Sequence, residues 1–268
     1  MDQAIRKRKA LVTGGSRGIG RGIALTLASE GYDVAFSHWN DQEEAEKTAE
    51  EIREGCGALC YVFNGNLEDA AEPERLTRQS VDALGHIDLL VNNAGITLFG
   101  DFRTMEPESI DKLLRLNLRA PLLMMRHVGR HMTEKQIRGN IVNITSTRAE
   151  RAYPGDSAYG GVKAGLSRAV QSAALDYAPS GIRVNCVAPG AIATIAEREP
   201  YYRALGRKIP LGRPGYPADV GRAVAWLASD QASYITGTTL RLDGGLILPG
   251  MPESVGLNEE SDWRGEGQ

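Results

Sequence analysis

The chain has 268 residues, a net charge of −3, 24% charged residues and 42% hydrophobic residues. These values are ordinary for a soluble globular protein, and the length suits one large α/β domain. The near-neutral charge argues against nucleic-acid or membrane partners, and no apolar run approaches the roughly 18 residues of a membrane span. No charged start is followed by the apolar segment of a secretory signal. We therefore expect a cytoplasmic protein that acts on a small molecule.

The three cysteines, Cys56, Cys60 and Cys186, lie at no spacing typical of metal ligands or of a redox pair. Their odd number suits free thiols rather than a disulfide framework. We expect no metal site in this chain.

Taken in chain order, short β-rich segments alternate with helical patterns. The expected strands are 9–13, 33–37, 58–63, 87–92, 139–145, 183–188 and 238–242. Several of them are continuous apolar runs, as expected for parallel strands covered by helices on both faces. The helical patterns include 19–29, 41–54 and 157–177. This alternation predicts an α/β fold with one Rossmann-type, doubly wound sheet of seven parallel strands, flanked by helices on both faces.

A glycine-rich segment, TGGSRGIG at 13–20, lies between the first expected strand and the first expected helix. Glycine allows positive φ and close backbone approach, and a helix N-terminus presents free N–H groups to a pyrophosphate. The strand, turn and helix are the context that a dinucleotide site requires. The residues expected to bind the cofactor here are Gly14, Ser16, Arg17, Gly18, Ile19 and Gly20.

The end of the second expected strand bears on the choice between NADP and NAD. A carboxylate that holds both ribose hydroxyls of NAD belongs there, but the chain has Ser37, His38 and Trp39, with Asp41 close behind. Arg17 in the glycine-rich segment can pair with a 2′-phosphate through parallel hydrogen bonds. We expect NADP, with NAD as the alternative, and we place His38 and Trp39 in the cofactor site.

Tyr159 and Lys163 are four residues apart in a helical pattern, so their side chains project from one face. A phenol has a pKa near 10, and lowering it to about 7 needs roughly 4 kcal/mol of differential stabilisation. A lysine ammonium and an oxidised nicotinamide ring are both positive and can supply it. The pair is therefore a candidate acid/base group.

Three further polar features accompany this pair. Ser146 follows the fifth expected strand, thirteen residues before Tyr159, and is placed to orient a substrate oxygen. The segment 92–95, NNAG, ends the fourth expected strand at the same sheet edge. Asn117 is a polar residue inside an apolar helical stretch, so it is either a satisfied core amide or holds a water chain leading to Lys163.

These motifs, in this order and spacing, resemble the short-chain dehydrogenase/reductase family. The resemblance extends through VNCVAPGAIAT at 184–194 and LDGG at 242–245, and covers roughly residues 8 to 247. It implies a catalytic tetrad of Asn117, Ser146, Tyr159 and Lys163. Asn66 stands where the family usually has an aspartate that receives the adenine amino group. The further cofactor residues that the resemblance implies are Asn66, Leu67, Asn93, Ala94, Gly95, Tyr159, Lys163, Pro189, Gly190, Ile192 and Thr194.

The resemblance also implies a single dinucleotide-binding catalytic domain over residues 1–268. We expect its core at 8–247, a substrate lid at about 191–212 and a partly ordered tail at 249–268. The family is commonly tetrameric, so we expect a homotetramer in which helices at 101–130 and 157–177 pack across subunits.

The substrate is expected to lie against the loop between Ser146 and Tyr159 and against the lid. Arg148 and Glu150 make this loop charged, and with Ser146 and Tyr159 they are the candidate substrate residues. This favours a sugar or polyol, as in bacterial glucose dehydrogenases. One alternative is a 3-oxoacyl-carrier-protein reductase, in which arginines would meet an acidic carrier. An alternative of another class is a non-catalytic nicotinamide-sensing protein.

Overall fold

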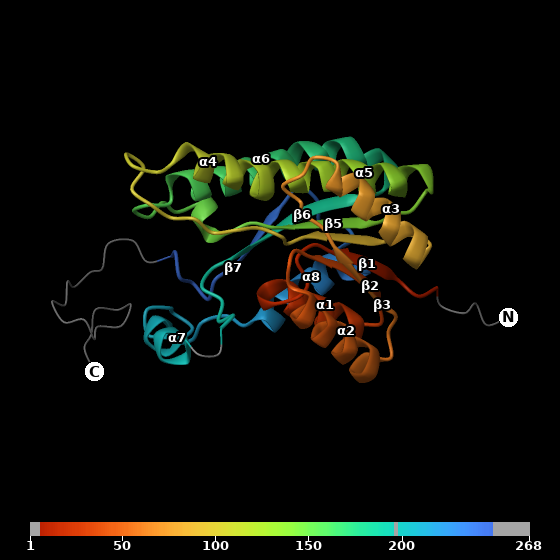
Figure 1. The fold of residues 1–268 in the computed structure, drawn as a ribbon, viewed down its shortest axis with the longest axis horizontal. Helices are drawn as coiled ribbons and strands as arrows, with labels where there is room; N and C mark the ends of the chain where they lie inside the picture. The colour runs from red at the N-terminus through yellow and green to blue at the C-terminus, as the bar shows by residue number, and fades with distance from the viewer. Residues whose placement is uncertain (1–5, 196–197, 249–268) are drawn as a thin grey trace.

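The computed structural model describes residues 6–195 and 198–248, and its centre is one seven-stranded sheet (Figure 1). The strands are β1 (Lys9–Val12), β2 (Asp33–His38), β3 (Cys60–Asn64), β4 (Leu89–Asn92), β5 (Asn140–Ile144), β6 (Arg183–Pro189) and β7 (Thr239–Leu242). All neighbouring pairs are parallel, in the order β3-β2-β1-β4-β5-β6-β7. The predicted fold class is therefore confirmed, and each expected strand overlaps the observed one.

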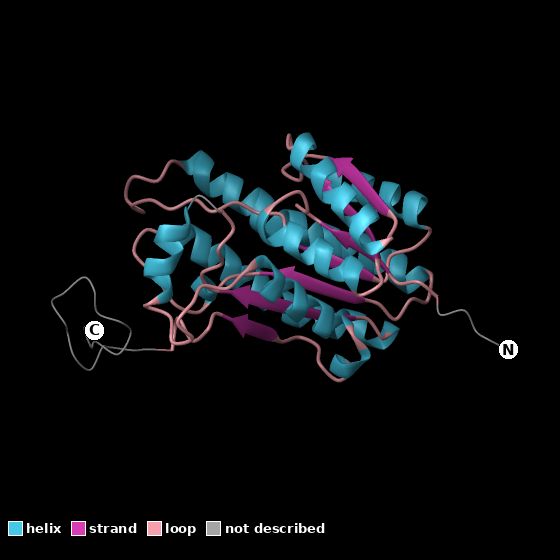
Figure 2. Cartoon of the chain, turned by 90° about the horizontal axis from the view of Figure 1, so that it is seen from below, coloured by secondary structure: helices cyan, strands magenta, loops and turns pink. Residues whose placement is uncertain are grey.

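Helices cover both faces of the sheet, and Figures 1 and 2 show the layers from two sides. One layer contains α1 (Gly18–Ser29), α2 (Gln42–Cys56) and α8 (Pro217–Ala228). The other contains α3 (Glu72–Leu84), α4 (Pro107–Leu114), α5 (Ala120–Glu134) and α6 (Ser157–Tyr177). The short helix α7 (Glu199–Gly206) lies beside the sheet, below α4 and α6 in Figure 1. Each face of the sheet has its own hydrophobic cluster, because parallel strands bury side chains on both sides.

The helix expected at 101–130 differs from the observed chain in two ways. Residues 101–106 form turns, and α4 begins only at Pro107, after Glu106 in an extended conformation. Proline suits the first turn of a helix, because its missing N–H has no partner there in any case. A π-helical turn, Arg115–Arg119, then separates α4 from α5. The predicted tail at 249–268 lies outside the described residues.

The strand order reverses its direction of growth between β1 and β4, which are neighbours in the sheet. A crevice opens at such a point, outside the carboxyl ends of the strands. Here Thr13 links the two strand ends: its Oγ1 accepts hydrogen bonds from the backbone N–H groups of Asn93 and Ala94, both 3.0 Å. Asn93 in turn donates from Nδ2 to the carbonyl oxygens of Thr13 and Gly14, both at 3.0 Å. The edges of the crevice are thus held together by side chains from both strands.

Within residues 6–195 and 198–248, no helix is long and apolar enough to cross a membrane. The same residues contain no cluster of three or more potential metal-binding side chains, and the three cysteines are free.

Candidate active site

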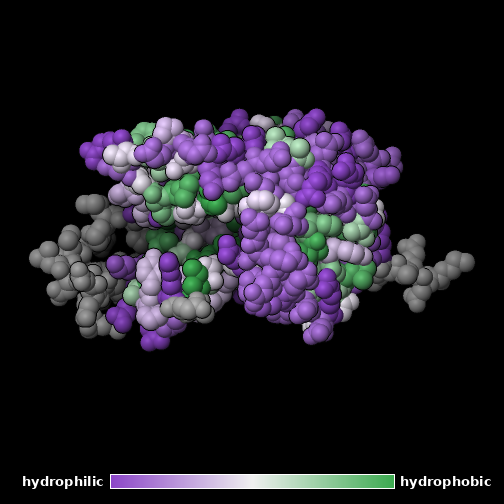
Figure 3. All heavy atoms as spheres, viewed as in Figure 1, coloured by the Kyte–Doolittle hydropathy of each residue, from purple (hydrophilic) through white to green (hydrophobic). Residues whose placement is uncertain are grey.

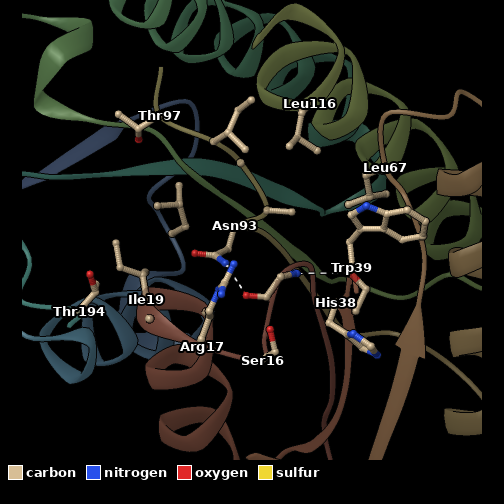
Figure 4. A pocket seen from close by; sticks show the side chains of 18 of the residues that line it. Ser16, Arg17, Ile19, His38, Trp39, Leu67, Asn93, Thr97, Leu116 and Thr194 are labelled. Atoms are coloured by element: carbon tan, nitrogen blue, oxygen red, sulfur yellow. Dashed lines mark hydrogen bonds between the residues drawn. The ribbon is translucent and has the colours of Figure 1, made fainter. Parts of the chain in front are cut away.

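A cavity of about 750 Å³ occupies the crevice at the carboxyl ends of the strands. Figure 4 shows Ser16 and Arg17 near its middle, His38 and Trp39 on one side, and Thr97 and Thr194 toward the opposite side. The surface is hollowed between the layer carrying α4 and α6 and the part carrying α7, with apolar residues around the hollow (Figure 3). The cavity wall contains every residue expected to bind a cofactor, namely Gly14, Ser16, Arg17, Gly18, Ile19, Gly20, His38, Trp39, Asn66, Leu67, Asn93, Ala94, Gly95, Tyr159, Lys163, Pro189, Gly190, Ile192 and Thr194.

The N-terminus of α1 faces this cavity and is open. In this described helix, no side chain caps the first turn and no acidic residue lies in it. The first N–H groups of a helix have no intrahelical acceptor, so they are available to an anion. Gly14 and Gly18 have φ values of +69° and +56°, and a Cβ on Gly20 would lie 1.9 Å from the carbonyl oxygen of Gly14. The residues present therefore fit a dinucleotide pyrophosphate.

The side of the cavity after β2 places a carboxylate and a guanidinium close together. Asp41 bends back to the glycine-rich loop, where its Oδ2 accepts a hydrogen bond from Ser16 Oγ (2.7 Å) and lies 3.6 Å from Arg17 Nε. The side chain of Arg17 is 78% exposed. His38 is buried; its Nδ1 accepts from the backbone N–H of Asp41 (3.2 Å), and its Nε2 has no partner within the described chain. This side of the cavity thus presents both a carboxylate and a guanidinium to a ligand.

The opposite side of the cavity brings together Ser146, Tyr159 and Lys163. Ser146 lies just beyond the end of β5, and its Oγ accepts a 3.2 Å hydrogen bond from the backbone N–H of Arg148. Tyr159 and Lys163 project from the first turns of α6. The ammonium of Lys163 is buried and donates to the carbonyl oxygen of Ile144 (3.0 Å). Its Nζ lies 5.9 Å from the centroid of the Tyr159 ring.

The pKa values of these two groups are shifted by burial. Burial raises the pKa of the Tyr159 phenol, while hydrogen bonding to the hydroxyls of Thr97 and Ser146 and the charge of Arg148 act in the opposite direction. Burial lowers the pKa of Lys163 to about 8. Lys163 is expected to lower the pKa of the phenol, and its Nζ lies 5.9 Å from the ring centroid, but burial is the largest influence on Tyr159. The protein alone therefore keeps the phenol protonated at neutral pH.

Asn117 is the one predicted tetrad member that does not line the cavity. It lies in the π-helical turn and is 1% exposed. Its Oδ1 accepts from the backbone N–H of Ile96 (2.9 Å), and its Nδ2 donates to the carbonyl oxygen of Ile96 (2.7 Å). A Cβ on Gly95 would lie 2.5 Å from Asn117 Oδ1 and 3.7 Å from Lys163 Nζ. The side chain is thus a satisfied amide that fixes the segment bordering Lys163, one of the two roles considered from sequence.

The charged loop residues Arg148 and Glu150, which we expected to meet the substrate, are absent from the described wall of this cavity. Arg148 Nη1 donates to Asp156 (2.9 Å), and Arg241 Nη1 donates to Glu150 (3.3 Å). Their charges are paired within the protein.

Several residues of the cavity were not among the predicted site residues. Thr97 contacts the phenol of Tyr159, and Asp41 was considered in sequence but not placed in the site. Thr97 follows the NNAG segment by two residues, a position whose importance appears only when that segment is folded against α6. Other such wall residues are Ser37, Gly65, Glu68, Ile96, Lys112, Leu116, Ile144, Thr145 and Ile195.

Known proteins resemble this chain over most of its length. A family model described as enoyl-(acyl carrier protein) reductase matches residues 14–247. The 3-oxoacyl-(acyl-carrier-protein) reductase of Staphylococcus aureus is 38% identical over 244 residues, covering 90% of this chain and 98% of that protein. A 3β-hydroxysteroid dehydrogenase of Eggerthella lenta is 35% identical over 249 residues, covering 91% and 95%.

Solved structures agree with these relatives. An acetoin dehydrogenase from Salmonella typhimurium superposes with a TM-score of 0.87 at 32% identity, covering 92% of this chain and 99% of that one. A short-chain dehydrogenase/reductase from Serratia marcescens gives 0.84 at 35% identity, covering 89% and 97%. The fold and the relatives together define an oxidoreductase that acts on carbonyl or hydroxyl groups. The chain belongs to the short-chain dehydrogenase/reductase family, which confirms the expected family and enzyme class.

Proposed function

We propose that this chain interconverts a ketone and a secondary alcohol with NADP(H), using Ser146, Tyr159 and Lys163 as its reacting and binding side chains. The observation that carries the proposal is their position: all three line the same cavity as the open N-terminus of α1. A bound nicotinamide supplies or accepts the hydride at its C4 atom. The protein then has only to orient the substrate carbon and to move one proton.

Each side chain has a separate task in this proposal. Ser146 Oγ orients the substrate oxygen by a hydrogen bond. The Tyr159 hydroxyl gives a proton to that oxygen during ketone reduction, for which the raised pKa of the phenol is suitable. Lys163 is held against the sheet by the carbonyl oxygen of Ile144 and would bind the nicotinamide ribose. Asn117 positions the segment next to Lys163 through both of its bonds to Ile96.

The preference for NADP over NAD rests on Arg17. Its side chain is exposed at the cavity, and Nε is 3.6 Å from Asp41. A 2′-phosphate placed there would gain charge-assisted hydrogen bonds from the guanidinium. Asp41 opposes this preference by its negative charge, but its Oδ2 is already engaged by the hydroxyl of Ser16.

For the substrate we propose a ketone with an apolar arm, a 3-oxoacyl thioester being the first candidate, rather than a sugar. The charges that favoured a sugar are paired with other residues of the protein, while Ile195 lines the cavity and the ring of Phe99 contacts Tyr159, and both are exposed hydrophobic residues. The relatives described above are named for a 3-oxoacyl thioester, a steroid and acetoin. Exposed basic residues at Arg207 and Lys208, beyond α7, are available to an acidic carrier.

The test is a substrate panel with each cofactor in turn: a 3-oxoacyl thioester, acetoin and an aldose, followed by absorbance of the reduced nicotinamide. We expect the highest kcat/KM for the thioester with NADPH and loss of about 10³-fold in Tyr159→Phe, with cofactor binding kept. Preference for the aldose would contradict the proposed substrate. Near-native activity of Tyr159→Phe would contradict the proposed chemistry.

We propose that the expected homotetramer forms through the α4, α5 and α6 layer. Leu114, Leu122 and Leu175 on these helices are 41%, 38% and 77% exposed, so packing against another subunit would remove their apolar surface from water. Sedimentation analysis of the protein and of Leu122→Glu should show a tetramer and a smaller species respectively. A monomeric wild-type protein would contradict this arrangement.

A further inference from the structure

Arg148 occupies an unusual setting beside Phe99, whose ring contacts Tyr159. Its guanidinium lies over two aromatic rings, 4.3 Å from the centroid of Phe99 and 4.5 Å from that of Tyr153. Such stacking is favourable for a guanidinium, which is planar and weakly hydrated. Only 29% of its side chain is exposed. The charge of Arg148 is therefore fixed in place.

Asp156, at the start of α6, binds this guanidinium. Its Oδ2 accepts from Arg148 Nη1 (2.9 Å), its Oδ1 accepts from the backbone N–H of Tyr153 (3.2 Å), and its side chain is 5% exposed. Asp156 is also the N-cap residue of α6, three residues before Tyr159. The backbone N–H of Gly160 donates to its carbonyl oxygen (2.7 Å). The ion pair thus joins the loop after β5 to the helical turn that carries the phenol.

Phe99 completes the link to Tyr159. Its ring meets the Tyr159 ring edge to face, with centroids 5.6 Å apart and an angle of 85°. The segment is anchored on both sides, at Ile96 by Asn117 and at Gly100 by a backbone bond to Gly155 (2.9 Å). Arg148, Phe99 and Tyr159 therefore form one stacked series.

The charged groups around the phenol are few. Among the described residues, Nζ of Lys163 lies 5.9 Å from the centroid of its ring, and Arg148, paired with Asp156, stacks on the neighbouring ring of Phe99. Arg151 is farther out, 6.0 Å from the centroid of the Tyr153 ring. The uncharged hydroxyls of Thr97 and Ser146 contact the phenol directly. The positive charge of Arg148 lowers the pKa of Tyr159.

We propose that Arg148, held by Asp156 and stacked on Phe99 and Tyr153, is a positioning residue that keeps the positive end of an ion pair near Tyr159 and sets the pH range of alcohol oxidation. The proposal rests on Tyr159 being the acid/base of the proposed function. In oxidation the phenolate accepts the proton of the substrate alcohol, so a nearby positive charge favours the reactive form. In reduction the neutral phenol donates its proton. The same positive charge therefore narrows, at its alkaline end, the pH range over which reduction proceeds.

The test uses the double variant Arg148→Met/Asp156→Asn, because Arg148→Met alone would leave a buried carboxylate without its partner. We expect the acidic limb of the pH profile of kcat/KM for alcohol oxidation to move up by roughly one pH unit, which is about tenfold in rate below the pKa. Ultraviolet difference titration of tyrosinate, with Tyr159→Phe in each background as the blank, should show the same upward shift without turnover. The single variant Arg148→Lys keeps the positive charge, so it should show little of this upward shift.

The matched control is Arg241→Met, which removes an arginine that pairs with another acid of the same loop, Glu150 (3.3 Å), and lies 3.9 Å from Asp243. Because Glu150 is exposed and Asp243 keeps its hydrogen bonds from the backbone N–H groups of Gly245 and Ile247, this variant should fold normally and leave both pH measurements unchanged. Loss of kcat in the double variant at unchanged pH profile and unchanged tyrosinate titration would reduce Arg148 to a structural role and overturn the inference. An equal shift in the control would overturn it as well. Failure of the proposed function is seen separately, as near-native activity of Tyr159→Phe.

Discussion

Lys163 lies beneath the ring of Tyr159, with Nζ 5.9 Å from the ring centroid, yet its hydrogen bond goes to the carbonyl oxygen of Ile144 at 3.0 Å. The ammonium is thus buried without a carboxylate partner among the described residues, and its pKa falls to about 8 from the ordinary 10.5. This position is suited to a ribose ligand. It also has a consequence for stability.

Lys163→Met should stabilise the protein at neutral pH. Below pH 8 both the folded and the unfolded wild type carry the proton, so the cost of the buried charge is fully present, about 3 kcal/mol. Between pH 8 and 10.5 the folded state releases the proton while the unfolded state keeps it, so wild-type stability rises relative to the variant. Urea unfolding of both proteins at pH 7 and at the alkaline end of this window measures the difference. A difference in unfolding free energy between the two proteins that does not change with pH would contradict this prediction.

Arg17→Ala should lower kcat/KM for NADPH by about tenfold, or 1.4 kcal/mol, with little effect on NADH. The reason is the loss of the exposed guanidinium at the ribose end of the cavity. Asp41→Asn should act in the opposite direction and raise the preference for NADPH, since it removes the neighbouring negative charge. Arg21→Ala is the matched control, because Arg21 pairs with Glu51 instead. A wild-type enzyme that prefers NAD tenfold would refute the role of Arg17.

Gly20→Ala should abolish measurable cofactor binding and cost roughly 2 kcal/mol of folding free energy. Its new Cβ would lie 1.9 Å from the carbonyl oxygen of Gly14 and 2.5 Å from Asn93 Nδ2, so the glycine-rich loop must move. Gly55→Ala in α2 is the control: a Cβ there meets nothing within 4 Å, and helix propensity should add about 0.5–1 kcal/mol. Fluorescence titration with the cofactor and thermal unfolding check both. Normal binding by Gly20→Ala would place the pyrophosphate elsewhere.

Asn117→Ala should destabilise the protein by about 1–2 kcal/mol, because the N–H and carbonyl of the partly buried Ile96 both lose their partner. The freed segment carries Thr97 and Phe99, which contact Tyr159, so kcat should fall more than KM rises. Steady-state kinetics and chemical unfolding test the two effects together. A loss of stability with kcat intact would leave Asn117 a packing residue only.

Much of this protein could be predicted from its sequence because the signals are local. Apolar strand runs, the glycine spacing at 14, 18 and 20, and the four-residue step from Tyr159 to Lys163 each depend on backbone geometry over a few residues. The predicted start of this helix, at residue 101, is wrong, because α4 begins at Pro107 after the extended residue Glu106. Amphipathic periodicity alone does not detect that boundary.

What the sequence by itself determined is the doubly wound sheet, the family and many of the residues that line the cavity, because strand ends of parallel sheets converge at one edge. Only the tertiary structure decided how the charges are used. Asp41 bends back onto Ser16, Arg148 turns to Asp156, and Glu150 turns to Arg241 rather than toward the cavity. These pairs join residues 8 to 91 positions apart, and a long flexible side chain takes whichever partner the fold places within reach.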